Sequence, residues 1–576
     1  MEQILKLLEE YDQKVLGNYF KDGHIDNIDH INLNDLKEFL EKLNKIKYKD
    51  DKIKNYKISA PNIIDLNNSI YEHQNLQNGT IIKNIYKNDK ITNELKQIGL
   101  KCIKENQVAV IFLAGGLGSR LHLKKAKGLL PITPILNKTF FQFYFEQIRF
   151  LQDYCFLFFE NEIKPYNNNF HNNINCYDEN TSNDYKKCNS NNNNNNNRAN
   201  NCLSQKENDS NNINDRKNAN YKYLENTNES ANIYIYIMTS DFTYDHTIKY
   251  LQDNNFFGIN SNNVKIFKQC NNFITNFNFD VLMKNHNTVL TAPGGNGTIF
   301  KALYNNMIIN DMINKNIKYI QIVSIDNILN KIADPVLIGL CSFYNCDIVN
   351  KAVIKKENEA VGIFCMKEKI NQKYDENKNM NTCEDDDKDN PFCVCEYNEL
   401  SEDILKNSEL FKYGNICHHI FSLDFLQHIV KNKIYNNMEL HKISREKEYY
   451  NFTSSVSNNN ILTKSKVYCY EYFIFDIFKY AKKILAYEVC CDNEFNPIKS
   501  NNNGDSILSA KISLSNLHKS WLIKKNFNII QSTQENNNFC EISPLISYDG
   551  SFFFNFPKQR DIQLPFVLDR DTLQEN

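Results

Sequence analysis

The stretch Val108-Ala-Val-Ile-Phe-Leu-Ala-Gly-Gly-Leu-Gly-Ser-Arg120 decides the fold. Its first six residues, 108–113, are a short apolar run of the kind that forms a strand buried on both faces of a sheet. The run leads into glycines at positions 115, 116 and 118, which lack Cβ atoms and let backbone N–H groups approach a phosphate or a base closely. Arg120 and then Lys127 add positive charge beside the turn. A triphosphate needs both features, so the stretch predicts a nucleotide-binding strand-to-loop turn.

Two other glycine-rich phosphate loops are excluded by spacing. A Walker loop requires Gly-Lys-Ser/Thr after four spacer residues, and no such sequence follows Gly115 or Gly116. A dinucleotide fingerprint that begins at Gly116 requires a small residue where Leu121 stands. An ordinary glycine-rich turn with a solvated arginine remains the alternative, and the flanking Arg120 and Lys127 disfavour it.

Strand and helix patterns alternate along the rest of the central chain. Strands are expected at residues 233–238, 264–267 and 319–325, and helices at 245–254 and 299–312. This alternation predicts an α/β domain with a parallel sheet covered on both faces. Ligands of such sheets bind beyond the carboxyl ends of the strands, so the residues that follow those ends are the candidates for the site.

Two further motifs follow strand ends. The turn Pro293-Gly-Gly-Asn-Gly-Thr298 leads into the second expected helix, and offers free N–H groups and the amide of Asn296 to a ligand. Asp326 and Asn327 follow the strand at 319–325, where a carboxylate can hold Mg²⁺ between phosphate oxygens. Each motif alone is as consistent with a simple turn or a helix cap, but three in order on one sheet favour a site.

Three segments are expected: a helical N-terminal domain over 1–103, a central catalytic domain over 104–499 and a small β-rich domain over 500–576. Within the central domain, polar Asn-rich tracts at about 167–220, 369–390 and 436–464 contain too few apolar residues to offset the entropy of ordering the chain. We expect these tracts to be disordered inserts without a catalytic role.

Composition excludes several classes of protein. The net charge of −2 over 576 residues provides no whole-chain field for nucleic acid or an anionic membrane. No signal peptide and no apolar run long enough for a membrane span are evident, and the 17 cysteines form no repeated framework, so a reducing cytoplasm is expected. The pairs Cys393/Cys395 and Cys490/Cys491 lack the two-residue gap of common zinc sites, which predicts no structural zinc.

The motifs together resemble those of the UDP-sugar pyrophosphorylases, and in particular the eukaryotic UDP-N-acetylglucosamine pyrophosphorylases. The resemblance covers most of the chain from about residue 93, outside the Asn-rich tracts. It rests on Leu113 to Arg120 with Lys127-Gly128, Met238-Thr-Ser240, Gly295-Asn-Gly297, Val323-Ser-Ile-Asp-Asn-Ile-Leu329, Ala333-Asp-Pro335, Glu396-Tyr397, Gly414-Asn-Ile416, Phe473-Ile-Phe-Asp-Ile-Phe478 and Cys540-Glu-Ile-Ser-Pro-Leu-Ile-Ser-Tyr548.

The resemblance implies a central nucleotidyltransferase domain of the GT-A, Rossmann-like kind, built on a mixed, mainly parallel sheet. It implies the Mg²⁺-dependent reaction of UTP with N-acetylglucosamine 1-phosphate to give UDP-N-acetylglucosamine and pyrophosphate. By position, the implied roles are catalysis and charge neutralisation by Arg120, Lys127 and Lys499; nucleotide binding by Leu113, Ala114, Gly115, Gly116, Gln269, Gly295 and Asp326; metal binding by Asp326; and sugar binding by Asn296, Glu396, Tyr397, Asn415, Phe473 and Phe475.

The chain departs from the family at a few positions: Leu117, His122 and Ala126 replace a glutamine, a glycine and a proline. The family's phosphate-contacting lysine is Cys469 here, and the hypothesis is that Lys464 or Lys466 substitutes for it. Two alternatives stay open. One is a UDP-glucose or broad-specificity UDP-sugar pyrophosphorylase, and the other is a catalytically silent protein that binds nucleotide sugars. The oligomeric state is not readable from the sequence.

Overall fold

The computed structural model describes residues 2–21, 32–47, 56–116, 125–163, 231–285, 287–356, 361–369, 389–396, 400, 409–451, 461–499, 505–533, 538–553 and 559–570. The expected inserts at 167–220 and, for the most part, 369–390 lie outside these residues. Arg120, Leu117, His122 and Tyr397 lie outside them as well.

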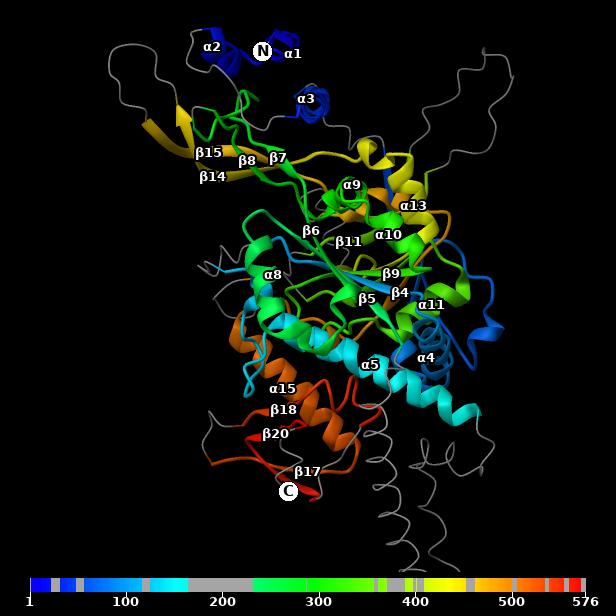
Figure 1. The fold of residues 1–576 in the computed structure, drawn as a ribbon. Coiled ribbons are helices and arrows are strands. Elements are labelled where there is room, and N and C mark those ends of the chain that lie inside the picture. Colours follow the sequence, from blue (N-terminus) through cyan, green and yellow to red (C-terminus); the bar gives the residue numbers. More distant parts are fainter. Residues whose placement is uncertain are drawn as a thin grey trace, which may run out of the picture.

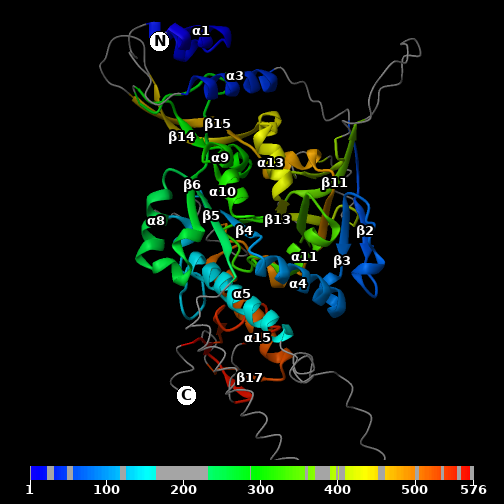
Figure 2. The ribbon, with the colours of Figure 1, turned by 45° about the vertical axis from the view of Figure 1, so that its right-hand side comes forward.

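A twelve-stranded sheet forms the centre of the molecule (Figures 1 and 2). Its main path runs β2 (Asn62–Asp65), β3 (Thr80–Lys83), β16 (Ile484–Glu488), β10 (Ile348–Ile354), β13 (Tyr413–Ser422), β9 (Tyr319–Ser324), β4 (Val108–Leu113), β5 (Ile233–Thr239) and β6 (Val264–Lys268). Along this path every pairing is parallel except the two that β13 makes with β10 and β9. A branch adds β11 (Ile363–Lys369), which pairs antiparallel with β1 (Tyr56–Ser59), β12 (Phe392–Cys395) and β13. The mixed, mainly parallel α/β fold expected from the sequence is confirmed.

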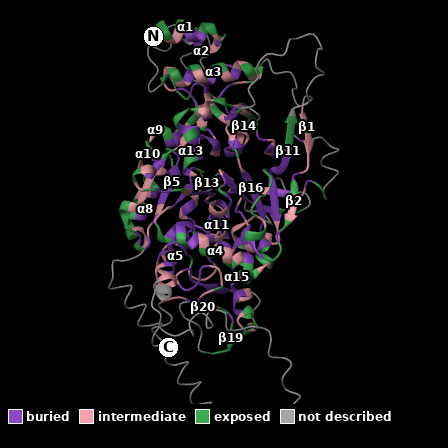
Figure 3. Cartoon of the chain, turned by 90° about the vertical axis from the view of Figure 1, so that its right-hand side faces the viewer, coloured by how far each residue is buried: buried purple, intermediate pink, exposed green. Residues whose placement is uncertain are grey.

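Strand β4 separates two hydrophobic cores, because its side chains alternate between the faces of the sheet. Val110 and Phe112 pack into the core shared with α4 (Asp89–Lys104), α5 (Phe140–Ile163) and α11 (Pro335–Tyr344). Ile111 and Leu113 pack into the core shared with α9 (Ile299–Asn305), α10 (Ile308–Asn314) and α13 (Leu423–Lys431). Burial on both faces explains why the strand is a continuous apolar run, and Figure 3 shows that the central strands are almost wholly buried.

The expected elements of the central domain are found with small changes of bounds. The strand over residues 108–113 is reproduced as β4, and the helix expected at 245–254 is α8 (Tyr244–Asp253). The helix expected over 299–312 is instead two helices, α9 and α10. Met307 between them has φ +54°, a left-handed conformation that ends one helix before the next begins.

The N-terminal segment is helical only as far as Lys47, with α1 (Glu2–Glu10), α2 (Lys14–Lys21) and α3 (Leu33–Lys47). Residues 56–104 contribute β1, β2, β3 and α4 to the central fold, so the expectation of an all-helical segment over 1–103 is wrong at residues 56–83, where the three strands lie. The sequence signal was misread because these strands are only four residues long.

The third disordered insert, expected at 436–464, is wrong, because most of this region forms one side and the start of the other side of a long β-hairpin. Strands β14 (His441–Asn451) and β15 (Ile461–Glu471) pair antiparallel in this region. Tyr450 and Tyr470 on this hairpin are buried against Phe39 and Leu40 of α3. Two short strands, β7 (Asn271–Phe273) and β8 (Thr291–Pro293), complete the platform on which the N-terminal helices sit (Figure 1).

The C-terminal part has a core of its own. It begins with α15 (Ile507–Lys524), which the expectation of a β-rich domain missed, and continues with the parallel pairs β17 (Asn528–Ile530) with β19 (Asp561–Gln563) and β18 (Cys540–Ile542) with β20 (Phe566–Leu568). Trp521, Ile542 and Leu568 lie in that core. The division into domains at residues 103 and 499 stays a prediction.

Candidate active site

The carboxyl end of β4 is fixed by its neighbours. The backbone N–H of Ala114 donates to Met238 O at 2.8 Å, and the hydroxyl of Thr243 donates to Ala114 O at 3.3 Å. On the other side, Ile325 N donates to Leu113 O at 3.4 Å. The backbone of Leu113 and Ala114 is therefore held between the ends of β5 and β9, which is where a parallel sheet places its ligands.

Gly115 lies against the side chain of Gln269. A Cβ atom at Gly115 would lie 2.7 Å from Gln269 Cδ and Nε2, so no side chain fits at this position without moving the glutamine. The backbone of Gln269 is held in place because its backbone N–H donates to Thr239 O at 2.8 Å. Gly116 is exposed, and a Cβ atom there would meet no atom within 4 Å. The structure thus brings together the expected base-reading residues Gly115, Gly116 and Gln269.

Lys127 and Asp326 form an ion pair at the same edge of the sheet. Lys127 Nζ lies 3.2 Å from Asp326 Oδ2 and donates to Ile498 O at 2.7 Å. Ser324 Oγ donates to Asp326 Oδ1 at 2.7 Å, and Ile498 N donates to Asp326 O at 2.9 Å. The side chains of Lys127 and Asp326 are 16% and 21% exposed, so both charges remain accessible to a ligand.

Lys499 follows Ile498 directly, so its backbone lies next to the residue that bonds both members of this ion pair. Its backbone N–H donates to Asp505 O at 2.9 Å, and its ammonium lies 6.0 Å from the centre of the Phe495 ring. Segments that are 199 and 371 residues apart therefore place Lys127, Asp326 and Ile498 together.

Asp326 suits a magnesium ion that is bound mainly by its substrate. Mg²⁺ keeps several waters and binds through one or two carboxylates plus phosphate oxygens. Among the described residues, the Asp326 carboxylate belongs to no cluster of three or more protein ligands. One accessible carboxylate beside a cationic edge fits that mode of binding, and it does not fit an all-protein cage such as those that hold Ca²⁺.

The second glycine turn faces the segment that carries the aromatic pair. Gly295 has φ +87°, and a Cβ atom there would lie 2.6 Å from Tyr472 O, so this position requires glycine. Gly297 N donates to Tyr472 O at 2.9 Å. Ile474 N donates to the Asn296 side-chain oxygen at 3.0 Å. These bonds fix the turn at Gly295 and Asn296 against the backbone on both sides of Phe473.

Phe473 and Phe475 stack with ring centres 5.1 Å apart. They do not alternate along a strand, because η11 (Ile474–Tyr480), a 3-10 helix, begins between them. Phe475 is buried in the core beneath, whereas Phe473 is half-buried and lies 4.3 Å from the ring of His441. His441 in turn contacts the Asp476 carboxylate at 3.1 Å. Burial raises the pKa of Asp476, and the contact with His441 acts in the opposite direction. Sequence reasoning missed this His–Asp pair because β14 was read as part of an insert.

Asn296 and Asn415 approach each other through Cys417, which sequence reasoning also missed. The Asn296 amide donates to Cys417 Sγ at 3.7 Å, and Cys417 N donates to the Asn415 side-chain oxygen at 3.1 Å. Burial, together with the nearby Asp326 carboxylate, raises the pKa of the Cys417 thiol to about 12. The thiol is therefore neutral at ordinary pH and adds no negative charge to the phosphate edge.

Glu396 and Asn415 both lie against Gly362, which brings them close to each other. Asn415 N donates to Gly362 O at 2.8 Å, and a Cβ atom at Gly362 would lie 3.2 Å from Glu396 Oε1. The expected sugar-binding residues Asn296, Glu396 and Asn415 are thus arranged around one side of the site.

The comparison with known families decides the class of protein. A family model described as UTP--glucose-1-phosphate uridylyltransferase matches residues 218–572, more than half of the chain. The chain belongs to this uridylyltransferase family.

Relatives of this chain carry related names. The chain is 30% identical over 361 residues to UDP-N-acetylhexosamine pyrophosphorylase-like protein 1 of Mus musculus, an alignment that covers 58% of this chain and 66%, just under two thirds, of the mouse protein. It is 28% identical over 519 residues to a probable UDP-N-acetylglucosamine pyrophosphorylase of Dictyostelium discoideum, which covers 87% of this chain and 86% of that protein. The crystal structure of a putative UDP-N-acetylglucosamine pyrophosphorylase from Entamoeba histolytica matches with a TM-score of 0.59 at 23% identity, over 83% of this chain and 96% of that one, and supports the fold.

Cys469, which stands where the family has a phosphate-contacting lysine, is part of a small apolar cluster. It is buried with Ile274, Leu282 and Leu290 beneath the β14–β15 hairpin. Lys464 and Lys466 are exposed, and strand alternation places them on the face of β15 opposite to Cys469. This placement argues against the hypothesis that either lysine replaces the family's cation at this position, and the hypothesis stays a prediction to be tested.

Among the residues that the structure describes, no helix combines the length and apolar character of a membrane span.

Proposed function

We propose that this uridylyltransferase transfers the uridylyl group of UTP to N-acetylglucosamine 1-phosphate, forming UDP-N-acetylglucosamine and releasing pyrophosphate. The observation that carries the proposal is the position of the Lys127–Asp326 ion pair. It lies at the same edge of the sheet as the contact between Gly115 and Gln269. The contact between Asn296 and Cys417 lies near Asp326. Base, phosphate and sugar would each meet a group of suitable chemistry along one edge of the sheet.

The uridine end is assigned to the exposed face of Gly116 and to Gln269. An amide side chain offers a donor and an acceptor to the uracil edge, and a glycine lets the base approach the backbone. The phosphates are assigned to Lys127, Lys499 and Arg120. For Lys127 the geometry supports an exchange in which its ammonium moves from Asp326 to a phosphate oxygen, since both partners are partly exposed.

The chemical step requires little covalent work from the protein. The anionic phosphate of the sugar attacks the α-phosphorus of UTP in line, the bond to the β-phosphate oxygen breaks, and pyrophosphate leaves on the opposite side. No general base is needed, because the attacking oxygen already carries charge. Mg²⁺ held by Asp326 would supply positive charge between the phosphate oxygens. Lys127 and Lys499 position the phosphates and offset the charge that develops on the leaving group.

The choice of N-acetylglucosamine over glucose is supported by the stacked rings of Phe473 and Phe475. An apolar wall beside the sugar favours an N-acetyl group, whereas the hydroxyl of glucose would leave that surface unfilled. The names of the mouse and Dictyostelium relatives point the same way, while the description of the family names glucose 1-phosphate.

The deciding experiment incubates the full chain with UTP, Mg²⁺ and a panel of sugar 1-phosphates, and measures pyrophosphate release. N-acetylglucosamine 1-phosphate is expected to give the highest kcat/KM. A value for glucose 1-phosphate that is equal or higher would reassign the acceptor. No pyrophosphate with any acceptor would support a protein that binds nucleotide sugars without catalysis. An Asp326→Asn variant and a reaction with EDTA serve as controls for the dependence on Mg²⁺.

The proposed setting is the cytoplasm, with small-molecule substrates and with neither nucleic acid nor membrane as a partner. The described cysteines support a reducing compartment, since all of them are free thiols.

A further inference from the structure

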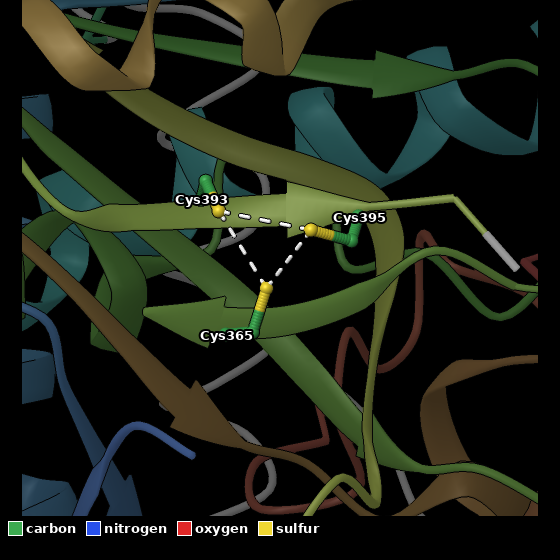
Figure 4. Close-up of side chains that lie close together, drawn as sticks. All are labelled: Cys365, Cys393 and Cys395. Atoms are coloured by element: carbon green, nitrogen blue, oxygen red, sulfur yellow. Dashed lines mark hydrogen bonds between the residues drawn. The ribbon is translucent and has the colours of Figure 1, made fainter. Parts of the chain in front are cut away.

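Three cysteines converge at one corner of the sheet, where β11 pairs with β12. Cys365 lies on β11, and Cys393 and Cys395 lie on the neighbouring strand β12 (Figure 4). The Sγ atom of Cys365 is 3.5 Å from that of Cys393 and 3.1 Å from that of Cys395, and the last two are 3.9 Å apart. All three sulfurs point toward one another in Figure 4.

Strand geometry explains this convergence. In the antiparallel pairing of β11 with β12, Cys365 stands directly opposite Cys393. Cys395 is two residues further along β12, so it projects from the same face and meets Cys365 diagonally. Apolar side chains from several segments surround the group: Ile58, Ile363, Leu400 and Phe411. The register of the sheet therefore fixes the three sulfurs in largely apolar surroundings, and no loop has to close to bring them together.

We propose that Cys365, Cys393 and Cys395 bind a soft, thiophilic d¹⁰ metal ion, with Zn²⁺ as the ordinary cellular occupant. A Zn–S distance of about 2.3 Å in a tetrahedral site places the sulfurs about 3.8 Å apart, so each observed separation is within about 1 Å of the one required. The three thiols release their protons to solvent on binding, and the ion offsets the charge of three thiolates that would otherwise be unfavourable in apolar surroundings. Water completes the coordination from the half-buried side at Cys393.

The proposal opposes the expectation from cysteine spacing that the chain has no structural zinc. That expectation considered Cys393 and Cys395 alone, whose single-residue gap is short for two ligands in a loop. On a strand the same gap places both sulfurs on one face, and the third ligand comes from 28 residues earlier in the chain. A spacing rule that assumes a loop does not detect such a site.

The position of the cluster gives the ion a structural consequence. Phe392 and Val394 project from the other face of β12 into the core that contains Phe475, and Glu396 continues that face. An ion bound to the cysteines would pin β11 to β12 and so fix the position of Glu396 beside Gly362. This consequence rests on the proposed function, because the proposed function assigns Glu396 to the sugar. Binding of the ion by the three cysteines does not rest on it.

The test is a titration of the full chain with Cd²⁺. The protein is reduced with a phosphine, treated with a chelator, freed of both by gel filtration under inert gas, and titrated with Cd²⁺ while the near-ultraviolet thiolate-to-cadmium absorbance is recorded. Wild type is expected to take up one Cd²⁺ per chain, and Cd²⁺ is expected to displace Zn²⁺ from the zinc-loaded protein. Cys393→Ser and Cys395→Ser are expected to lose the absorbance band and to weaken binding at least about tenfold. Cys490→Ser and Cys270→Ser, which change half-buried cysteines outside the cluster, are the matched controls and should titrate like wild type.

A second measurement keeps the test decisive if a variant fails to fold. Zn²⁺ that binds only the folded state should raise the unfolding temperature of wild type and of Cys490→Ser. Cadmium uptake by Cys393→Ser equal to that of wild type would overturn the proposal. A reduced wild type with neither an absorbance band nor a thermal shift would overturn it as well. Mass spectrometry of the reduced protein checks that binding is not lost because a disulfide has formed. Forming a disulfide would require an added oxidant to take up two electrons and would release two protons. None of these readouts depends on pyrophosphate release, so failure of the proposed function would leave them unchanged.

Discussion

Two lysine–carboxylate groups lie near each other below the carboxyl edge of the sheet, and they differ in burial. Lys127 and Asp326 form a single ion pair that is 16% and 21% exposed. Lys351 is wholly buried, and its ammonium lies 2.5 Å from both Asp334 and Glu494. The two groups are close because Asn327, next to Asp326, donates to Glu494 O at 2.6 Å.

The difference in burial separates a group that can exchange partners from one that cannot. A buried ion must keep all its partners, because water cannot replace a lost one. The inner group meets this demand: Lys331 lies 2.9 Å from Glu494, and the Tyr487 hydroxyl donates to Asp334 at 3.1 Å. Although burial alone would raise the pKa of Asp334, Lys351 and Lys331 hold it below its usual value. The outer group has solvent on one side, so a phosphate can take the lysine without leaving the carboxylate stranded.

The largest expected effect follows removal of the inner lysine. Lys351→Met leaves Asp334 and Glu494 with one cation, and breaking a buried pair in this way typically costs about 3–5 kcal/mol of folding free energy. We expect a large fall in the unfolding temperature, measured by differential scanning calorimetry.

The control adds Asp334→Asn to Lys351→Met, which removes the stranded charge and should recover part of the loss. If the Lys351→Met variant has the unfolding temperature of wild type, the inner and outer groups do not differ in stability as their burial implies.

The outer lysine should affect activity and not stability. Lys127→Met removes a positioned cation from the phosphates, and loss of such a donor typically costs on the order of a hundredfold in rate. The unfolding temperature should stay near that of wild type, because water can solvate the exposed side of Asp326. Steady-state pyrophosphate release and calorimetry measure the two quantities. Lys125→Met, two residues away and exposed, is the matched control and should leave both unchanged.

The sequence predicted the outer group better than the inner one. Both residues follow a pattern that can be recognised in the local sequence. Asp326 follows a buried apolar strand, and Lys127 follows a glycine-rich turn. The bounds of β4 also matched, since burial on both faces produces an unbroken apolar run. The contact between Gly115 and Gln269 was expected only through the family resemblance, because nothing local links residues so far apart in sequence.

The elements that the sequence missed depend on tertiary contacts. The β14–β15 hairpin is rich in charged and polar residues, and its buried positions become evident only when α3 packs on Tyr450 and Tyr470. Lys351 was overlooked because it interrupts an apolar strand, and its partners are Asp334, which caps the N-terminus of α11, and Glu494, which follows β16. The cluster of three cysteines requires the register of β11 with β12, which no spacing rule contains.

Acid should destabilise the region around the inner group. Burial lowers the pKa of His419 to about 3, and its imidazole bonds Asn350, the neighbour of Lys351. Because the folded pKa lies below the unfolded value of about 6.5, the stability this group contributes is present above about pH 6.5 and is lost as pH falls toward 3. At pH 5 the loss from His419 alone is about 2 kcal/mol.

This prediction is checked by the unfolding temperature between pH 7.5 and 5.0. His419→Gln keeps a donor for Asn350 and should reduce the slope with pH, whereas the exposed His428→Gln should keep the wild-type slope. The same slope in all three proteins would show that His419 is not buried in its neutral form.

The smallest effect is expected at a third kind of lysine–carboxylate pair. Lys464 lies 3.7 Å from Glu446 on the β14–β15 hairpin, and both side chains are more than 60% exposed, at 63% and 62%. Exposed pairs contribute about 0–1 kcal/mol, and β15 directs Lys464 and Lys466 away from the face that holds Cys469. The double variant Lys464→Ala with Lys466→Ala should therefore match wild type in kcat, in KM for UTP and in unfolding temperature.

Cys469→Lys supplies the contrast, because it forces an ammonium into the apolar cluster of Ile274 and Leu290, and it should lower stability without raising activity. A double variant with sharply weakened turnover would show that a lysine of this hairpin reaches the phosphates. The distinction between exposed and site-forming lysines would then have to be made by reach as well as by burial.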